Sequence, residues 1–152
     1  MKLMKNIGAL VAVMRAAANT AVTAGGAGDA TLVTGAILDR QAKAMPLSGV
    51  LAIPYAATLA QGETLSIAYV VESGNADDLA DAVDLVSATA AVVATGPTGG
   101  GTVTGVFEVD LNLSPAGRYV RAKFTPDLSA ADTDTAALSA VMVVGGTNEV
   151  PV

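Results

Sequence analysis

The stretch Thr64-Leu65-Ser66-Ile67-Ala68-Tyr69-Val70-Val71-Glu72 alternates larger apolar residues with small or polar ones. Successive side chains of a β-strand point to opposite faces, so this period of two places the odd-numbered residues from Leu65 to Val71 on one face. β-branched and aromatic residues are also enriched in strands. The stretch therefore predicts a half-buried β-strand.

The same pattern recurs along the chain between short breaks that contain glycine or proline. Thr102 to Leu111 alternates in this way, and so does Arg118 to Phe124, where Val120, Ala122 and Phe124 point inward. Strands are predicted near residues 31–38, 47–53, 64–72, 83–94, 102–111, 117–124 and 136–144, with one more inside 7–14. Seven or eight antiparallel strands indicate an all-β fold, a jelly-roll or β-sandwich with a short N-terminal arm.

Two segments depart from simple alternation. The run Ala136 to Val144 is apolar on both faces, which predicts a strand that is covered on both sides. Residues 75–94 have a helical alternative, because their acidic beginning has the composition of one or two helical turns or of a loop. Ser87 to Ala94 is rich in valine and threonine and is followed by Gly96-Pro97, so we expect a strand there.

The composition argues against most kinds of active site. The chain has no cysteine, histidine or tryptophan, and only 3% of its 152 residues are aromatic. Metal sites that use thiolate or imidazole, disulfides, and nucleophiles that depend on histidine are therefore excluded, while calcium or magnesium held by oxygen atoms is not. Aromatic rings dominate most binding pockets, so a buried small-molecule site is disfavoured. We expect a protein that is not an enzyme, with no catalytic residues, cofactor or metal.

The charge is distributed unevenly. The net charge is −6, yet residues 1–23 hold Lys2, Lys5, Arg15 and no acid, which leaves five basic and 14 acidic residues in the remainder. We therefore divide the chain into an apolar, basic N-terminal arm at 1–23 and a single β-sandwich domain at 24–152. The acidic total disfavours direct contact with nucleic acid.

The arm also has the outline of a secretory signal, with basic residues before an apolar run from Ile7 to Met14. Arg15 ends this run after eight residues, which is unusual for a signal and far too short to cross a bilayer. We favour an arm or first strand that packs on the body or on a neighbouring subunit. No membrane association is expected.

Four polar segments invite a chemical interpretation. The acids between Glu72 and Asp84 lack the calcium-loop pattern, which favours a solvated loop over a calcium site. Glu108 and Asp110 have the side-chain chemistry of a glycosidase pair, but acids two apart on a strand normally face solvent. The segment 96–102 lacks the lysine of a phosphate loop and is expected to form a hairpin. Residues 127–134 are expected to form a surface loop with one helical turn.

Arg121 and Lys123, with Tyr119 beside them, form an outward row of positive charge on an acidic body. Such a row can form a contact with a partner. The favoured interpretation is that these cations pair with acids on a neighbouring strand, such as Glu108 and Asp110.

Several short segments resemble the small capsid cement (decoration) proteins of tailed double-stranded DNA phages. They are Arg118-Tyr119-Val120-Arg121, Gly35-Ala36-Ile37-Leu38-Asp39-Arg40, the strand Leu65 to Glu72 with its acidic loop, and the final strand after Asp134-Thr135. The likeness spans about residues 30–145 and is greatest to the jelly-roll cement protein of a short-tailed Bordetella phage.

This resemblance implies a jelly roll, dimeric or otherwise homo-oligomeric, that binds the major capsid protein on the outside of an icosahedral shell and reinforces the shell. It also implies a place in the virion, after assembly in the cytoplasm of a bacterial host. The residues expected at the interfaces are Leu10, Val11, Val13, Arg15, Tyr119, Arg121 and Lys123. The alternatives are another β-sandwich component of the virion or tail, and a secreted module that binds carbohydrate or protein.

Overall fold

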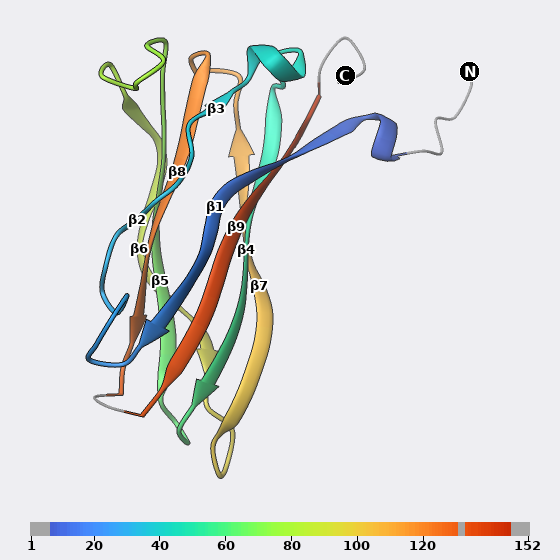
Figure 1. Cartoon of the computed structure of the whole chain (residues 1–152). Helices are drawn as coiled ribbons and strands as arrows, with labels where there is room; N and C mark the ends of the chain where they lie inside the picture. The colour runs from blue at the N-terminus through green and yellow to red at the C-terminus, as the bar shows by residue number, and fades with distance from the viewer. Residues whose placement is uncertain (1–6, 131–132, 147–152) are drawn as a thin grey trace.

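The computed structural model describes residues 7–130 and 133–146, which form two stacked antiparallel sheets (Figure 1). Sheet A has the strand order β1-β9-β4-β7 and sheet B the order β2-β8-β5-β6, with β3 paired to β8 as well. The strands are β1 (Val11–Thr23), β2 (Val33–Thr34), β3 (Leu38–Asp39), β4 (Ser48–Leu59), β5 (Thr64–Gly74), β6 (Val83–Thr95), β7 (Gly101–Asn112), β8 (Tyr119–Leu128) and β9 (Thr135–Gly145). Two short 3₁₀ turns, η1 (Ile7–Ala9) and η2 (Gln41–Lys43), complete the described elements.

The pairing order is that of a jelly roll. β1 pairs with β9, the short strands β2 and β3 pair with β8, β4 pairs with β7, and β5 pairs with β6. The chain thus behaves as one long hairpin that is wound into two sheets, which is the double Greek key arrangement. The all-β, antiparallel fold class that was predicted from the sequence is confirmed.

The core lies between the two sheets and consists mainly of aliphatic side chains. Alternation along β5 and β8 is as predicted, since Leu65, Ile67, Val120 and Phe124 are at most 1% exposed. On β9 the inward residues from Ala136 to Val144 are also buried. The inward faces of β5 and β8 on sheet B meet those of β9, β4 and β7 on sheet A and exclude water.

Several predicted boundaries were wrong. β4 continues through Pro54 to Leu59, although Pro54 was expected to follow the end of a strand. Proline lacks the N–H that a ladder needs, and the β4–β9 ladder has no pair at Ile53 or Pro54. The strand predicted inside 7–14 is β1, which begins four residues later and extends to Thr23, so most of the predicted arm belongs to sheet A. The acidic segment 75–82 contains turns and no helix.

The predicted strand 31–38 is broken into β2 and β3 where the chain bridges the edges of the two sheets. The Gly35 N–H donates to the Ala122 carbonyl of sheet B at 3.0 Å, and the Ala36 N–H donates to the Ala16 carbonyl of sheet A at 2.8 Å. A Cβ at Gly35 would lie 2.4 and 2.5 Å from those two carbonyl oxygens. Only glycine allows the chain to close this edge of the sandwich.

A buried guanidinium organises the connections at the end of the sandwich where β1 begins. Arg40 is 2% exposed, and its terminal nitrogens donate to the carbonyls of Ala116 and Gly117 at 2.5 and 2.7 Å and to those of Pro46 and Leu113 at 2.6 and 2.8 Å. No carboxylate pairs with Arg40 among the described residues, and burial lowers its pKa. Four carbonyl dipoles therefore take the place of a counter-ion.

We expect Arg40→Met to lower the free energy of unfolding by about 3–5 kcal/mol, because it leaves four carbonyls without their donor. Urea denaturation followed by circular dichroism measures the loss. Arg118→Met is the matched control, since Arg118 forms an exposed ion pair with Asp39 and should have a much smaller effect. Equal losses in the two variants would contradict the structural role of Arg40.

Candidate functional site

The outer face of sheet A is apolar across its middle strands. It is formed by Val13 on β1, Ser139, Val141 and Val143 on β9, Val50, Ala52 and Pro54 on β4, and Val106 on β7. The side chains at the edges are open to solvent, with Val13 65% and Val106 53% exposed. Within the described residues only the inward side of β9 is packed in the core, so the covering of its outward side stays a prediction.

The register places opposite charges at the two edges of this face. One row runs Arg15, Val141, Ala52, Glu108 across β1, β9, β4 and β7. Its neighbour runs Val13, Val143, Val50, Asp110. Within 7–130 and 133–146, none of the three charged side chains forms an ion pair.

Towards the far end of the same face the side chains become small. The next rows are Ala21, Ala137, Ala56, Thr104 and then Thr23, Thr135, Thr58, Thr102. The hydroxyls of Thr58 and Thr102 lie 3.0 Å apart and are hydrogen-bonded. This half of the face can therefore be approached closely by another surface.

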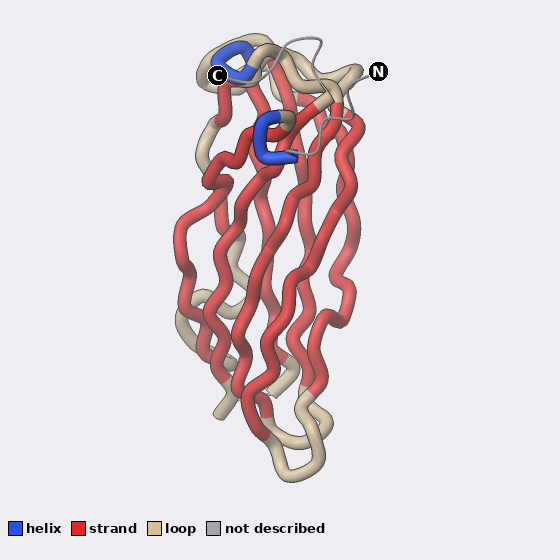
Figure 2. Tube along the Cα trace, turned by 90° about the vertical axis from the view of Figure 1, so that its right-hand side faces the viewer, coloured by secondary structure: helices blue, strands red, loops and turns tan. Residues whose placement is uncertain are grey.

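Two hollows open on this face. One, of about 480 Å³, lies beside the start of β1 and is lined by Leu10, Val11, Val50, Val143 and Asp110 among others. The second, of about 530 Å³, follows the β-bulge of β1 and is lined by Arg15, Ala17, Ala18, Asn19, Ser139, Ala140 and Val141. Figure 2 views the molecule from this side and shows η1 standing in front of the sheet at the end where β1 begins.

Exposed apolar side chains also gather at that end of the sandwich. Ile7 is 74% exposed, and Leu10, Met45 and Leu47 are between 37% and 46% exposed. The Leu47 N–H donates to the Gly145 carbonyl, and Gly145 pairs with Val11, so the two segments are neighbours. We call these four residues the apolar end.

On the outer face of sheet B, Glu72 is enclosed by two cations. Its carboxylate accepts hydrogen bonds from Arg121 at 2.5 Å and from Lys123 at 2.7 Å, and its side chain is only 8% exposed. Burial acts to raise the pKa of Glu72, but the hydrogen bonds from Lys123 and Arg121 outweigh it, so the pKa is lowered. The prediction that these cations pair with an acid on a neighbouring strand is confirmed, but the acid is Glu72 on β5 rather than Glu108 or Asp110, which lie on the other sheet.

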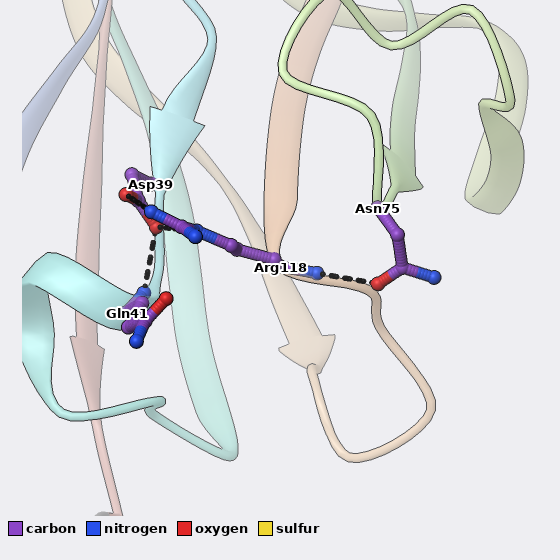
Figure 3. Close-up of polar contacts among 4 residues, drawn as sticks. All are labelled: Asp39, Gln41, Asn75 and Arg118. Carbon is purple, nitrogen blue, oxygen red and sulfur yellow. Dashed lines mark hydrogen bonds and ion pairs between the residues drawn. The ribbon is translucent and has the colours of Figure 1, made fainter.

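Tyr119 takes part in a separate group of exposed contacts. The Arg118 guanidinium lies 5.0 Å from the centre of its ring and donates to both carboxylate oxygens of Asp39 at 3.0 and 2.7 Å. Figure 3 shows this pair, with the backbone N–H of Gln41 donating to Asp39 and that of Arg118 donating to Asn75. The Arg118 hydrogen bonds lower the pKa of Asp39. The group joins the loops at one end of sheet B.

The residues predicted at interfaces thus form two groups on opposite sheets. Leu10, Val11, Val13 and Arg15 lie where β1 begins on sheet A, whereas Tyr119, Arg121 and Lys123 lie on β8 of sheet B. The second group is engaged within the chain. Sequence reasoning did not identify the acids of β7 as the opposite edge of the first group's surface, because only the strand order brings them into one face.

The other predicted segments form local structure. Asp81 accepts the backbone N–H groups of Asn75 and Ala76. Residues 96–100 form the β6–β7 connection, where the Gly100 N–H donates to Pro97. The predicted hairpin at 96–102 was wrong, because β6 and β7 lie in different sheets and do not pair. β8 extends to Leu128, so the predicted loop 127–134 begins later than expected, and residues 131 and 132 lie outside the described ranges. Among the described residues no three acids are grouped to hold a metal, and no helix is long and apolar enough to span a membrane.

Comparison with known proteins gives distant structural likenesses. No family model and no curated protein matches the chain. The VP2 subviral particle of infectious bursal disease virus is similar with a TM-score of 0.49 and 13% identity over 91% of this chain and 33% of that one. T=1 particles derived from the same virus give 0.48 and 12%, over 93% and 32%. A family 11 carbohydrate-binding module from Clostridium thermocellum gives 0.28 and 6%, over 98% and 96%. The chain spans about a third of the viral chains.

We expect Glu72→Gln to lower the free energy of unfolding at neutral pH by about 1–3 kcal/mol, because Arg121 and Lys123 lose their charged acceptor. Since the pKa of Glu72 is lowered in the folded state, its ionised form stabilises the fold above the ordinary value of 4.5, and this contribution is lost as the pH falls through the lowered pKa. The difference between wild type and variant should therefore shrink in acid.

Urea denaturation over a pH series measures this. Asp127→Asn, at an exposed position of β8, serves as the control and should change little at any pH. A difference between wild type and Glu72→Gln that stays constant into acid would show that the charge of Glu72 is not responsible.

Proposed function

We propose that this chain is a structural protein of a virus particle, a capsid cement (decoration) protein that binds the outside of an icosahedral phage shell and stabilises it. The class of particle comes from the resemblance of residues 35–40, 65–72 and 118–121 to phage cement proteins. The major capsid protein is the proposed partner. The proposal places the chain in the virion, assigns it no enzymatic activity, and has assembly take place in the bacterial cytoplasm. The likeness to one Bordetella phage protein stays a prediction from sequence.

The observation that carries the proposal is the apolar end. Ile7, Leu10, Met45 and Leu47 are exposed together at one end of a sandwich whose core is already built from other aliphatic residues. Contiguous apolar patches of this kind mark contact surfaces. In this proposal the apolar end rests on the shell, and burial of these side chains provides most of the attachment.

The geometry of the loop supports attachment at this end. Arg40 binds the carbonyl of Pro46, and the Leu113 N–H donates to the Leu47 carbonyl at 2.9 Å. The segment that carries Met45 and Leu47 is therefore held in place before it meets a partner. Preorganisation of this kind reduces the entropy lost on binding.

We expect the double variant Leu10→Asp/Leu47→Asp to lose shell binding by at least about tenfold, because it places two charges in the proposed contact. Co-sedimentation of purified protein with shells that lack the chain measures binding. Val92→Asp on β6 is the matched control, since Val92 is 60% exposed on the other sheet, and it should bind like wild type.

The abundance of the chain in purified particles tests the proposal independently. A cement protein approaches the copy number of the major capsid protein on a gel of purified virions. A few copies would indicate a tail or other minor component instead, and absence from the particle would refute a virion role and favour the secreted binding module.

A further inference from the structure

We infer that the outer face of sheet A binds a second copy of this chain, through a two-fold axis that runs parallel to the strands between β9 and β4. The inference concerns the isolated protein and does not depend on attachment to a shell. The apolar side chains in the middle of the face, Val141 and Val143 with Val50 and Ala52, would form the centre of the contact.

The first argument is the composition of β9. Its inward residues Leu138, Ala140 and Met142 are at most 1% exposed in the core. The outward residues Val141 and Val143 are also apolar, lie next to each other on the other side and are only partly buried. A central strand with two apolar faces is typical of a sheet that is covered on both sides.

The second argument is charge complementarity. A two-fold axis parallel to the strands places β1 of one copy over β7 of the other. Positions along the strands do not change, so each row of residues faces the same row of the other copy. Arg15 and Glu108 share one row at opposite edges, so Arg15 of each copy faces Glu108 of the other. A two-fold axis across the strands would instead place Arg15 over β1, where residues 11–23 include no acid.

The reach of the side chain fits this arrangement. Aligned sheets pack at about 30° to each other, and each edge strand lies about 7 Å from the centre of a four-stranded sheet. The rotation displaces an edge residue by roughly 4 Å, which an arginine side chain can span. Asp110, in the adjacent row of β7, offers a second acceptor.

The third argument is the size of the face. Four strands about 4.8 Å apart, and five rows about 6.8 Å apart, cover about 650 Å². A specific interface of standard size buries about 800 Å² on each partner, so the face is large enough once the side chains at its rim are included. The alanine and threonine rows let the two backbones approach closely, and the hollows at Leu10 and Arg15 can receive side chains of the partner.

Exchange of the two charges tests the inference. Arg15→Glu and Glu108→Arg should each weaken dimerisation by at least about tenfold. Each substitution places like charges opposite each other, and the two-fold axis repeats this repulsion at both edges of the interface. The double variant Arg15→Glu/Glu108→Arg restores opposite charges and should return the dissociation constant to within about threefold of wild type. Sedimentation of the full chain over a range of concentrations measures the dissociation constant.

Two further variants guard against misfolding and other surfaces. Val141→Asp places a charge in the centre of the face and should yield a monomer with an unchanged circular dichroism spectrum. Val92→Asp on sheet B should dimerise like wild type. A wild-type chain that stays monomeric at its highest soluble concentration, or a double variant that fails to recover, would overturn the inference.

The terminal residues 1–6 and 147–152, which lie outside the described ranges, are the competing occupants of this face. If they cover it in a monomer, the full chain will not dimerise, and a chain without them will; this result would also overturn the inference. If Val141→Asp loses dimerisation but binds shells normally, the dimer is supported and the proposed function stands. If Leu10→Asp/Leu47→Asp loses shell binding but still dimerises, attachment through the apolar end is supported and the dimer stands.

Discussion

The guanidinium of Arg40 is the interaction on which one end of this molecule depends. Four carbonyls converge on it, one from the connection between β3 and β4 and three from the connection between β7 and β8, and none of them lies within a strand. A buried cation costs a large desolvation energy, which the structure offsets with strong, well-directed acceptors. Because Pro46 is one of these acceptors, the same guanidinium positions the segment that exposes Met45 and Leu47.

The two sheets handle charge in opposite ways. On sheet B the acid and the cations meet within the chain, so Glu72, Arg121 and Lys123 satisfy one another and present little net charge. On sheet A the cation and the acids are separated by the width of the sheet. Charges separated in this way are satisfied only by solvent or by a partner. The contrast leaves the charges at the two edges of sheet A available to a partner.

Much of the fold could be predicted from the period of two, because most of the long strands have one face in the core. Residues 64–72 and 118–124 show this clearly, and both are strands with the predicted inward side chains. The continuation of β4 beyond Pro54 could not be predicted, since a proline that interrupts one ladder while the other persists leaves no local signal. The burial of Arg40 could not be predicted either, because its partners include backbone carbonyls that are distant in the sequence.

The partner of the positive row on β8 was mispredicted for a related reason. Which acid meets Arg121 and Lys123 depends on which strand lies beside β8, and the jelly-roll winding selects β5 rather than β7. Residue type and spacing do not show which strand lies beside β8. The predicted residues at the start of β1 do lie together on the surface of sheet A, because they are consecutive on one strand and need no long-range information.

The direction of the strands relative to the apolar end has a consequence for avidity. A two-fold axis parallel to the strands leaves both copies pointing the same way, so a pair presents two apolar ends on one side. Such a pair is bivalent: once one end has bound a repetitive surface, the other is held at high effective concentration above the next site. Contacts that are individually weak would then persist together, and release would require both ends to detach at once.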